Sequence, residues 1–531
     1  MNKKFDDIKM GLDGGLFSSA DAREDVSVSR VLCDQTLMVD AGGEFELPTH
    51  FPEIVRLIKV NVRPSVPARF ISGSGVQING GVDYSAIFLG SDGEVYCASF
   101  PDEYSVSVPF EGDSIVGSEK ITVSAKACPD NVSWRVSGAS RINIRCRLSV
   151  KILALTEDKR DCGVRSENGG RYLKLIKKVP SCKGLFGMRD DMTLTSSVDT
   201  SKEGTRYLYS DCKVLVTDTA AGDGYVDCRG YAAIRHLMTY KGEIYSVSDK
   251  ISFSETVELD GACPSASVSV TGVCAEAIPA VRDFGAESDA KTDVSLRICL
   301  AAAVLLPCEL EYVKDMYSAD RECSLELTRS VLPAFVACKN GNMTFCEREE
   351  LSKMGIESGA INIIDVSGSA KIDNVERDGD VFVAKGKSRF SFVYSSADTG
   401  ECSLAECEFP FKYEFEGKGD GVSRFEASVS AVEPRARVEG ERISFDCELA
   451  FSICAVGETE ICYVAAIKSE GAERKERKGL TVCYPDSSES LWSIAKRYGA
   501  PVEDVARENG LDCSVDADEM LMPGGVKFMI I

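Results

Sequence analysis

Three long stretches of the chain repeat an apolar residue at every second position, six times in a row. The apolar positions are Ile142, Ile144, Cys146, Leu148, Val150 and Ile152 in the first stretch, Val294, Leu296, Ile298, Leu300, Ala302 and Val304 in the second, and Ile443, Phe445, Cys447, Leu449, Phe451 and Ile453 in the third. A period of two places alternate side chains on opposite faces of a β-strand. The pattern therefore predicts three long strands in antiparallel sheets, each with one buried face.

The same features precede each long strand. A glycine leads into one strand, a polar turn follows, a second strand comes next, and another glycine then precedes the long strand. The first glycines are Gly81, Gly230 and Gly386, the second strands begin at Tyr104, Ile251 and Phe409, and the later glycines are Gly138, Gly285 and Gly440. Both sets of glycines recur at nearly the same spacing, which indicates one β-rich unit repeated three times.

Near the C-terminus the apolar period becomes helical. One apolar stripe runs through Leu491, Ile494, Ala495 and Tyr498. This stripe predicts a short helix, with Ser488 as its N-cap and Gly499 as its left-handed C-terminal residue. Pro501 suits the first turn of a second helix. Apolar residues then line the inner face of that helix and a closing strand, at Val502, Val505, Ala506, Val526, Phe528 and Ile530.

Charge and hydropathy limit the possible partners and location of the chain. Lys plus Arg is 61 and Asp plus Glu is 84, so the formal net charge is −23. Such an acidic chain repels phosphate backbones, which argues against a nucleic acid partner. Residues Met1 to Asp13 lack an apolar segment, and the apolar run from Ile298 to Leu306 is far shorter than a membrane span. We therefore expect a cytoplasmic chain without a transmembrane segment.

The residues needed for common catalytic and metal sites are scarce. The 22 cysteines form no Cys-x-x-Cys pair, and the histidines are only His50 and His236. A zinc site is therefore not expected, and in a cytosolic chain the thiols should be reduced, with Cys146 and Cys447 acting as small apolar residues. A phosphate-binding loop is absent, and His236 lies on a predicted strand. These observations predict no enzyme, no metal and no cofactor.

Two segments resemble known domains. Glu46-Leu47-Pro48 followed by Phe51 to Leu57 is similar to the lead-in of the SPOCS domain, a repeat of spore-coat proteins in endospore-forming bacteria. The order Leu491 to Gly499, Pro501 to Val505, Asn509-Gly510-Leu511 and Met522-Pro523-Gly524 resembles a LysM domain. Three SPOCS repeats before one LysM domain is the organisation of SipL-like spore-coat morphogenetic proteins. The resemblance implies a mainly β fold, with three antiparallel β-rich SPOCS repeats followed by a small βααβ LysM domain.

The resemblance also suggests where the domains divide. The expected parts are an N-terminal tail at 1–27, SPOCS repeats at 28–160, 161–325 and 326–467, a charged linker at 468–479 and the LysM domain at 480–531. The linker carries a basic cluster of Arg474, Lys475, Arg477 and Lys478. This cluster is either part of a plain solvated linker or a contact for an acidic partner or lipid headgroups.

By resemblance, the chain would be a non-enzymatic scaffold for spore-coat assembly in the mother-cell cytoplasm, recruited to the forespore surface. Its LysM groove would bind the coat morphogenetic ATPase (SpoIVA-like). The groove residues would be Ser488, Glu489, Ser490, Leu491, Trp492, Asn509, Gly510, Leu511 and Pro523. Trp492 is the best single candidate for a contact, because aromatic residues dominate interface energetics, and its alternative role is core packing.

A second function stays open, namely peptidoglycan or cortex-glycan binding. The LysM resemblance supports it. Against it, the chain reads Ser488-Glu489-Ser490 where many LysM domains have Gly-Asp-Thr in the sugar-binding loop, and no export signal is visible.

Overall fold

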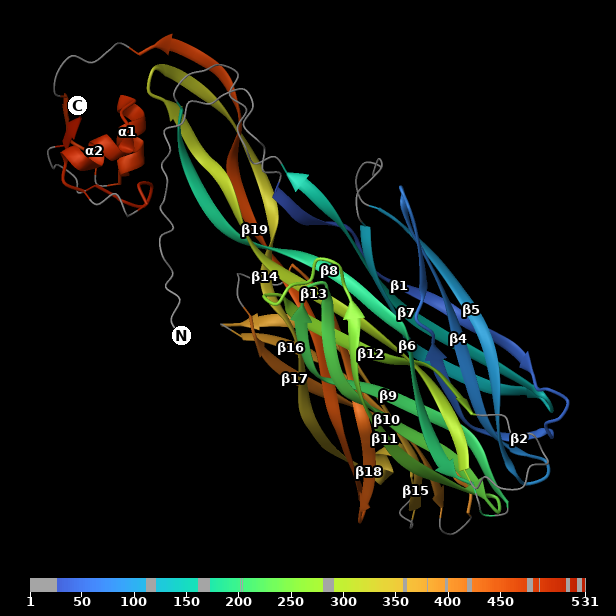
Figure 1. Ribbon diagram of the computed structural model, residues 1–531. Coiled ribbons are helices and arrows are strands. Elements are labelled where there is room, and N and C mark those ends of the chain that lie inside the picture. The colour runs from blue at the N-terminus through green and yellow to red at the C-terminus, as the bar shows by residue number, and fades with distance from the viewer. Residues whose placement is uncertain are drawn as a thin grey trace.

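The computed structural model in Figure 1 describes residues 26–110, 121–160, 172–200, 202, 204–279, 291–356, 361–379, 381–396, 400–417, 423–474, 481–486, 488–511, 516–522 and 528–530. Most of these residues lie in antiparallel strands, and the two short α-helices lie near the C-terminus. The prediction of a mainly β fold with a small C-terminal module is confirmed.

The strands form three consecutive units, each with two sheets. Unit 1 contains β1 (Val26–Glu46), β2 (Ile54–Pro64), β3 (Ala68–Ser72), β4 (Gly75–Gly90), β5 (Val95–Pro109), β6 (Ile121–Gly138) and β7 (Arg141–Arg160). One of its sheets has the order β1-β7-β6, and the other has the order β2-β4-β3 with β5 also paired to β4. A single core cluster joins residues of both sheets.

Units 2 and 3 repeat this order of strands. Unit 2 contains β8 (Tyr172–Asp199), β9 (Thr205–Gly222), β10 (Tyr225–Tyr240), β11 (Glu243–Glu258), β12 (Ser267–Pro279) and β13 (Lys291–Ser318). Unit 3 contains β14 (Arg321–Glu350), the 3-10 helix η1 (Leu351–Met354), β15 (Ile361–Asp378), β16 (Val381–Ser396), β17 (Cys402–Glu416), β18 (Arg424–Glu439) and β19 (Arg442–Glu473). The sheets are β12-β13-β8 with β11-β10-β9, and β14-β19-β18 with β15-β16-β17.

The long alternating stretches are the central strands β7, β13 and β19 of their sheets. Every apolar position of the three predicted series is buried. Removing a large apolar side chain from water contributes roughly 1.5–3 kcal/mol, so these strands carry much of each core. Cys146 and Cys447 take their places in this series as small apolar residues, and burial raises the pKa of their thiols to about 11 and about 12.

A glycine facing an aromatic residue recurs in the second sheet of each unit. The register pairs Gly80 with Tyr104 and Gly230 with Phe253, and in unit 3 the aromatic ring of Phe411 lies over Gly386. A Cβ on these glycines would lie within 3.0 Å of the ring, so only glycine leaves room for it. In unit 1 this glycine is Gly80, one residue before the Gly81 that the spacing selected.

The three units meet at a repeated β-bulge. The register shifts past Ile58 in β2, past Leu208 in β9 and past Ile364 in β15, and a bulge re-aims the extra side chain. These three residues enter one apolar cluster that also contains Ile87, Leu237 and Val393 from the neighbouring strands. The same local irregularity therefore supplies one apolar contact of each unit with the other two.

A buried ion cluster lies beside this apolar contact and draws one charged residue from each unit. Lys59 Nζ of unit 1 lies 2.8 Å from Asp365 Oδ2 of unit 3, and Arg235 of unit 2 lies 3.6 Å from Asp365 Oδ1. Lys59 also donates to Ser367 Oγ at 3.0 Å. Loss of one partner of a buried pair leaves an uncompensated charge, so the cluster disfavours separation of the units.

Units 2 and 3 extend beyond their sandwiches as two β-ribbons, which we call the stalk: residues 172–184 with 305–318, and 321–338 with 454–473 (Figure 1). A series of small apolar clusters joins the two ribbons. They include Cys182 with Cys338 and Cys454, then Leu310 with Leu332 and Ile461, and then Met316 with Val464.

The C-terminal module contains β20 (Thr481–Cys483), α1 (Leu491–Tyr498), α2 (Val502–Glu508) and β21 (Phe528–Ile530). β20 pairs antiparallel with β21, which confirms the βααβ order. Gly499 ends α1 with a φ of 63°, as predicted, but the N-cap is Ser490 rather than Ser488. Pro501 lies one residue before the first helical residue of α2, at its N-cap.

Several segments differ from the predicted division of the chain. Strand β19 continues to Glu473, so the first half of the predicted 468–479 linker is strand. β13 ends at Ser318 and β14 begins at Arg321, so these strands divide before the expected boundary at 325. Gly285, Pro523, most of the N-terminal tail and Lys475, Arg477 and Lys478 of the basic cluster lie outside the described residues.

The glycine–aromatic contact can be tested at Gly386. A Cβ there would lie 2.1 Å from Lys371 O and 2.5 Å from the Phe411 ring, so Gly386→Ala should lower the free energy of unfolding by about 1–3 kcal/mol. The measurement is a urea unfolding curve. Gly43→Ala is the control, because nothing lies within 4 Å of its Cβ position. Equal stability of the two variants would contradict the steric argument.

Candidate functional site

The two loops that were predicted to form the binding groove are held together by backbone contacts. Leu491 N donates to Met520 O at 3.0 Å, and Trp492 N donates to Ala517 O at 3.0 Å. Met522 N donates to Glu489 O at 2.9 Å, and Ser490 forms an isolated β-bridge with Leu521. The loop between β20 and α1 is therefore joined to the loop between α2 and β21.

The predicted groove residues occupy different environments within this module. Ser488 is exposed and Glu489 is half-buried, and Glu489 accepts a hydrogen bond from Arg497. Ser490 is buried as the N-cap and accepts from Ser493 N at 3.2 Å. Leu491 is buried in the module core.

The remaining groove residues close the end of α2. Asn509 donates to Val505 O at 2.7 Å, and Gly510 has a φ of 66°. Leu511 packs against the module core, and its N–H donates to Ala506 O at 2.9 Å. These contacts terminate the helix. Pro523 belongs to the residues that the structure does not describe.

Trp492 lies against the stalk instead of on an open surface. Its ring makes an edge contact with Tyr317 of β13, with centroids 5.0 Å apart, and its Nε1 donates to Asp315 Oδ2 at 2.9 Å. Lys496, one turn later on α1, lies 2.6 Å and 2.7 Å from the two oxygens of Asp315. Tyr317 Oη donates to Ala500 O at 2.6 Å. The sequence did not identify Asp315 or Tyr317, because they belong to unit 2 and are far from Trp492 along the chain.

Opposite charges flank this contact. Lys177 of β8 forms ion pairs with Asp516 and, at 3.5 Å, with Glu519, and Lys314 pairs with Asp518. Partial burial of Lys177 disfavours its charge, but the hydrogen bond with Asp516 and the nearby carboxylates outweigh burial and raise the pKa of Lys177. The loop at 516–519 is therefore a stalk-facing acidic segment.

Among the described residues of the module, the two large apolar side chains with the greatest exposure lie on its two joined loops. Tyr484 follows β20 and is 67% exposed, and Leu521 precedes β21 and is 60% exposed. They belong to the two joined loops, and Leu521 is the bridge partner of Ser490. Leu521 carries no signal in the sequence beyond its place near Met522. Exposed apolar side chains that gather into one patch are typical of interaction surfaces, whereas isolated ones are ordinary on protein surfaces.

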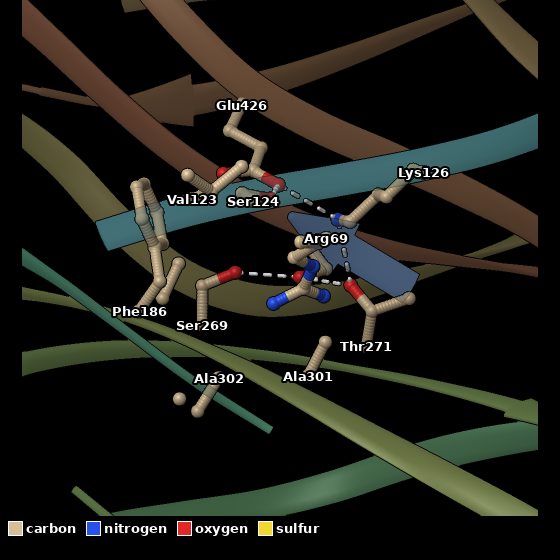
Figure 2. A pocket seen from close by; sticks show the side chains of 13 residues that line it. Arg69, Val123, Ser124, Lys126, Phe186, Ser269, Thr271, Ala301, Ala302 and Glu426 are labelled. Atoms are coloured by element: carbon tan, nitrogen blue, oxygen red, sulfur yellow. Dashed lines mark hydrogen bonds and ion pairs between the residues drawn. The ribbon is translucent and has the colours of Figure 1, made fainter. Parts of the chain in front are cut away.

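A polar junction of the three units is a second candidate site. A cavity of about 20 Å³ lies there. Figure 2 shows side chains that line it, including Arg69, Lys126, Thr271 and Glu426. This volume suffices for about one water molecule. Within the described residues, Glu426 Oε2 and Arg69 Nε have no hydrogen-bond partner. Both residues line this cavity, whose size suits a single structural water rather than a ligand.

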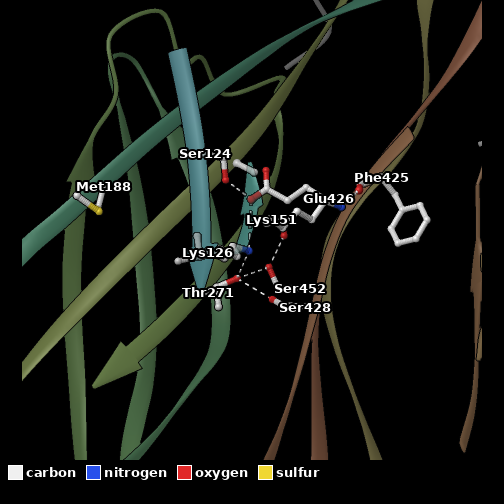
Figure 3. Close-up of polar contacts among 12 residues, drawn as sticks. Ser124, Lys126, Lys151, Met188, Thr271, Phe425, Glu426, Ser428 and Ser452 are labelled. Atoms are coloured by element: carbon white, nitrogen blue, oxygen red, sulfur yellow. Dashed lines mark hydrogen bonds and ion pairs between the residues drawn. The ribbon is translucent and has the colours of Figure 1, made fainter. Parts of the chain in front are cut away.

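Polar contacts around the same junction link all three units (Figure 3). Lys126 of β6 lies 3.3 Å from Thr271 Oγ1 of β12 and 3.5 Å from Glu426 Oε1 of β18. Thr271 in turn lies 2.9 Å from Ser452 Oγ of β19. A larger cavity of about 220 Å³ between units 1 and 2 is lined by residues that include Ser29, Thr122 and Leu306.

His236 is fully buried in unit 2. Its Nε2 lies 2.9 Å from Ser196 Oγ and its Nδ1 lies 2.6 Å from Ser210 Oγ. The Ser196 hydroxyl donates a hydrogen bond to Asp249, and the Tyr207 hydroxyl donates one to Ser210. A neutral His236 that carries its hydrogen on Nε2 therefore satisfies every hydrogen bond in this series. Burial lowers the pKa of His236 despite the opposing charge of Asp249. Asp249 bonds the serine instead of the imidazole, which is not the arrangement of a nucleophilic triad.

Two further observations concern other possible sites. Among the described residues, no group of three or more His, Cys, Asp and Glu side chains is arranged to hold a metal ion. In the described part of the chain, no helix has the length and apolar character to cross a membrane.

The N-cap assignment can be tested with two serines. Ser490→Ala should destabilise the module by about 1 kcal/mol, because it removes the acceptor for Ser493 N, whereas Ser488→Ala should leave stability unchanged. Unfolding of the module can be followed by Trp492 fluorescence in a Trp134→Phe background, since these are the two tryptophans of the chain. A larger loss in Ser488→Ala would restore the original prediction.

The buried histidine should make stability depend on pH. Since the folded-state pKa of His236 lies below its usual value, the unfolded chain binds more protons as the pH falls below about 6.5, and stability declines. Above that pH the neutral form persists in both states and this contribution is complete. The difference in unfolding free energy between wild type and His236→Gln should shrink from pH 7 to pH 5. A constant difference would contradict the assignment.

Comparisons with known proteins match two parts of the chain. Residues 206–278 match the family model described as SipL, SPOCS domain, which spans β9 to β12 of unit 2. Residues 487–519 match the LysM domain model, which covers α1, α2 and much of the two joined loops. No curated protein and no solved structure matches the chain. The chain therefore carries a SipL-type SPOCS domain and a C-terminal LysM domain, the combination that the sequence predicted.

Proposed function

We propose that the chain is a non-enzymatic scaffold for spore-coat assembly whose LysM domain binds the coat morphogenetic ATPase at the forespore surface. The SPOCS and LysM matches support a sporulation protein with a recognition module. The observation that carries the proposed binding site is the exposure of Tyr484 and Leu521 on the two joined loops. Ser488 and Glu489 lie on the same loop as Tyr484 and add polar contacts.

We propose that units 1 and 3 are SPOCS repeats as well, within the expected ranges 28–160 and 326–467. The support is structural equivalence with unit 2, which contains the matched segment. All three units share the order of strands, the glycine that faces an aromatic residue, and the bulge at Ile58, Leu208 or Ile364. A bulge at the same place in each unit is expected of copies of one repeat, because bulges are kept within a family rather than arising at random.

The joined units suit a scaffold because they form one body. The apolar cluster and the ion cluster of Lys59, Asp365 and Arg235 each join all three units. A body of this kind keeps its surfaces at fixed positions relative to one another. The mechanism would be recognition without turnover, in the mother-cell cytoplasm.

Glycan binding is the second candidate function, and the match to the LysM domain model favours it. The exposed ring of Tyr484 could stack on a sugar of peptidoglycan or cortex glycan. The same loop carries Ser488-Glu489-Ser490 instead of the usual Gly-Asp-Thr, and Ser490 is occupied as a helix cap. Protein binding therefore remains the leading proposal.

Capture experiments with the full-length chain separate these functions. Wild-type protein should retrieve the coat ATPase from sporulating cells, and Tyr484→Ser/Leu521→Ser should weaken capture about tenfold or more, because exposed apolar anchors dominate interfaces. Affinity is then measured with the purified ATPase. The control is Val273→Ser/Ile278→Ser, which removes two exposed apolar residues of unit 2.

The outcomes distinguish the two candidates. Equal capture by wild type and the Tyr484/Leu521 variant would remove these residues from the site. Sedimentation of wild-type protein with purified peptidoglycan, without any ATPase capture, would establish the glycan-binding function in place of the scaffold function.

A further inference from the structure

The outer end of the β8–β13 ribbon buries apolar residues on both of its faces. Tyr172 and Met316 pack toward the second ribbon, in a cluster with Val464. Their chain neighbours Leu173 and Tyr317 pack instead into the LysM core. Neighbouring residues of a strand point to opposite faces, so the LysM domain covers the face that the second ribbon leaves open.

The stalk and the LysM domain are chemically complementary where they meet. Leu175 and Tyr317 are buried by the LysM domain, and without it they would expose an apolar patch on the stalk. Around them, Lys177 and Lys314 meet the acidic loop at 516–519, and Asp315 meets Lys496 and the indole of Trp492. Stalk and LysM domain each supply both signs of charge, which fixes one orientation.

The linker side adds a further contact. Arg474, which follows β19, donates to Asp320 O through its backbone at 2.7 Å. Its guanidinium donates to Lys496 O and Arg497 O at 3.4 Å, near the C-terminal end of α1, where a cation is favoured. The residue of the predicted basic cluster that the structure describes is therefore used within the chain.

We propose that this docking is an autoinhibitory latch on the LysM site. The docked stalk covers Trp492 and the 516–519 loop, while Tyr484, Ser488 and Leu521 stay exposed. One side of the joined loops is thus occupied by the chain itself. A partner that needs both sides must displace the stalk, and release exposes Trp492 and Lys496. This regulation rests on the proposed function of the LysM domain as a binding module.

The latch depends on charge, so salt should weaken it. The Debye length falls from about 10 Å at 0.1 M salt to about 3 Å at 1 M, and the side chains of Lys314 and Glu519 are exposed to solvent. High salt should therefore favour the released form, in which the Trp492 indole meets water. A Trp134→Phe background makes Trp492 the sole tryptophan, so acrylamide quenching and the emission wavelength report its exposure.

The decisive variant is Lys177→Glu/Lys314→Glu, which reverses two stalk charges and leaves the LysM domain unaltered. It should increase acrylamide quenching, shift emission to the red at low salt, and strengthen capture of the coat ATPase roughly tenfold, the scale of typical coupling between sites. The control is Lys178→Glu/Arg329→Glu, which makes the same charge change at stalk residues that pair with Glu311 and Glu460. The control should match wild type in quenching and capture.

Each outcome decides the proposal. Quenching equal to wild type, with no salt dependence in wild type, overturns the latch. Increased quenching with unchanged capture of the ATPase overturns the inhibition. Capture of the ATPase by Lys177→Glu/Lys314→Glu, without capture by wild type, supports the autoinhibition. If neither form retains the ATPase or purified peptidoglycan, the proposed function and its regulation both fail, whereas quenching still decides whether the docked arrangement exists.

Discussion

The central strand of each unit imposes the constraint on which the rest of the structure depends. It must bury one face along its whole length, and in units 2 and 3 it is longer than the sandwich that it crosses. Within the sandwich, β13 buries Val294 to Val304 against its own unit. Beyond it, the same strand needs new partners, and the second ribbon and the LysM domain supply them. One strand thereby links the core of unit 2 to Asp315 and Tyr317 at the LysM contact.

The junction of the three units fixes the base from which the stalk projects. The bulges at Ile58, Leu208 and Ile364 send side chains out of their own sheets and into a shared cluster. A regular strand would have kept alternate residues within one sandwich. Because each unit contributes the same irregularity, a local feature of the repeat becomes a contact between repeats. The polar junction around Thr271 and Glu426 adds directional bonds that nonpolar packing lacks (Figure 3).

The sequence predicted those features that depend on local periodicity. The alternating series from Ile142, Val294 and Ile443 identified the central strands, and the stripe from Leu491 to Tyr498 identified α1. Prediction failed where local chemistry allowed two solutions. Ser488 and Ser490 are both competent caps, and the structure begins α1 directly after Ser490, the residue that is bridged to Leu521. The polar run after Lys468 reads as a linker, but pairing with β14 extends β19 through it to Glu473.

The role of Trp492 could not be read from the sequence for a related reason. An aromatic residue at the start of a helix can pack inward, contact a partner, or contact another part of its own chain. The contacts with Asp315 and Tyr317 decide between these roles. Both residues lie on β13, and the alternating pattern of that strand predicts only a β-rich repeat. Yet the segment Asp315-Met316-Tyr317 carries a signal of its own, because two large apolar neighbours on a strand require a cover on each face. The neighbouring ribbon covers one face. The LysM domain covers the other face, either as a permanent part of the core or as a module that can leave and bind elsewhere. A contact that combines two aromatic rings with several partly exposed ion pairs is suited to release, since salt screening and competing charges weaken it far more than they weaken the apolar junction at the base.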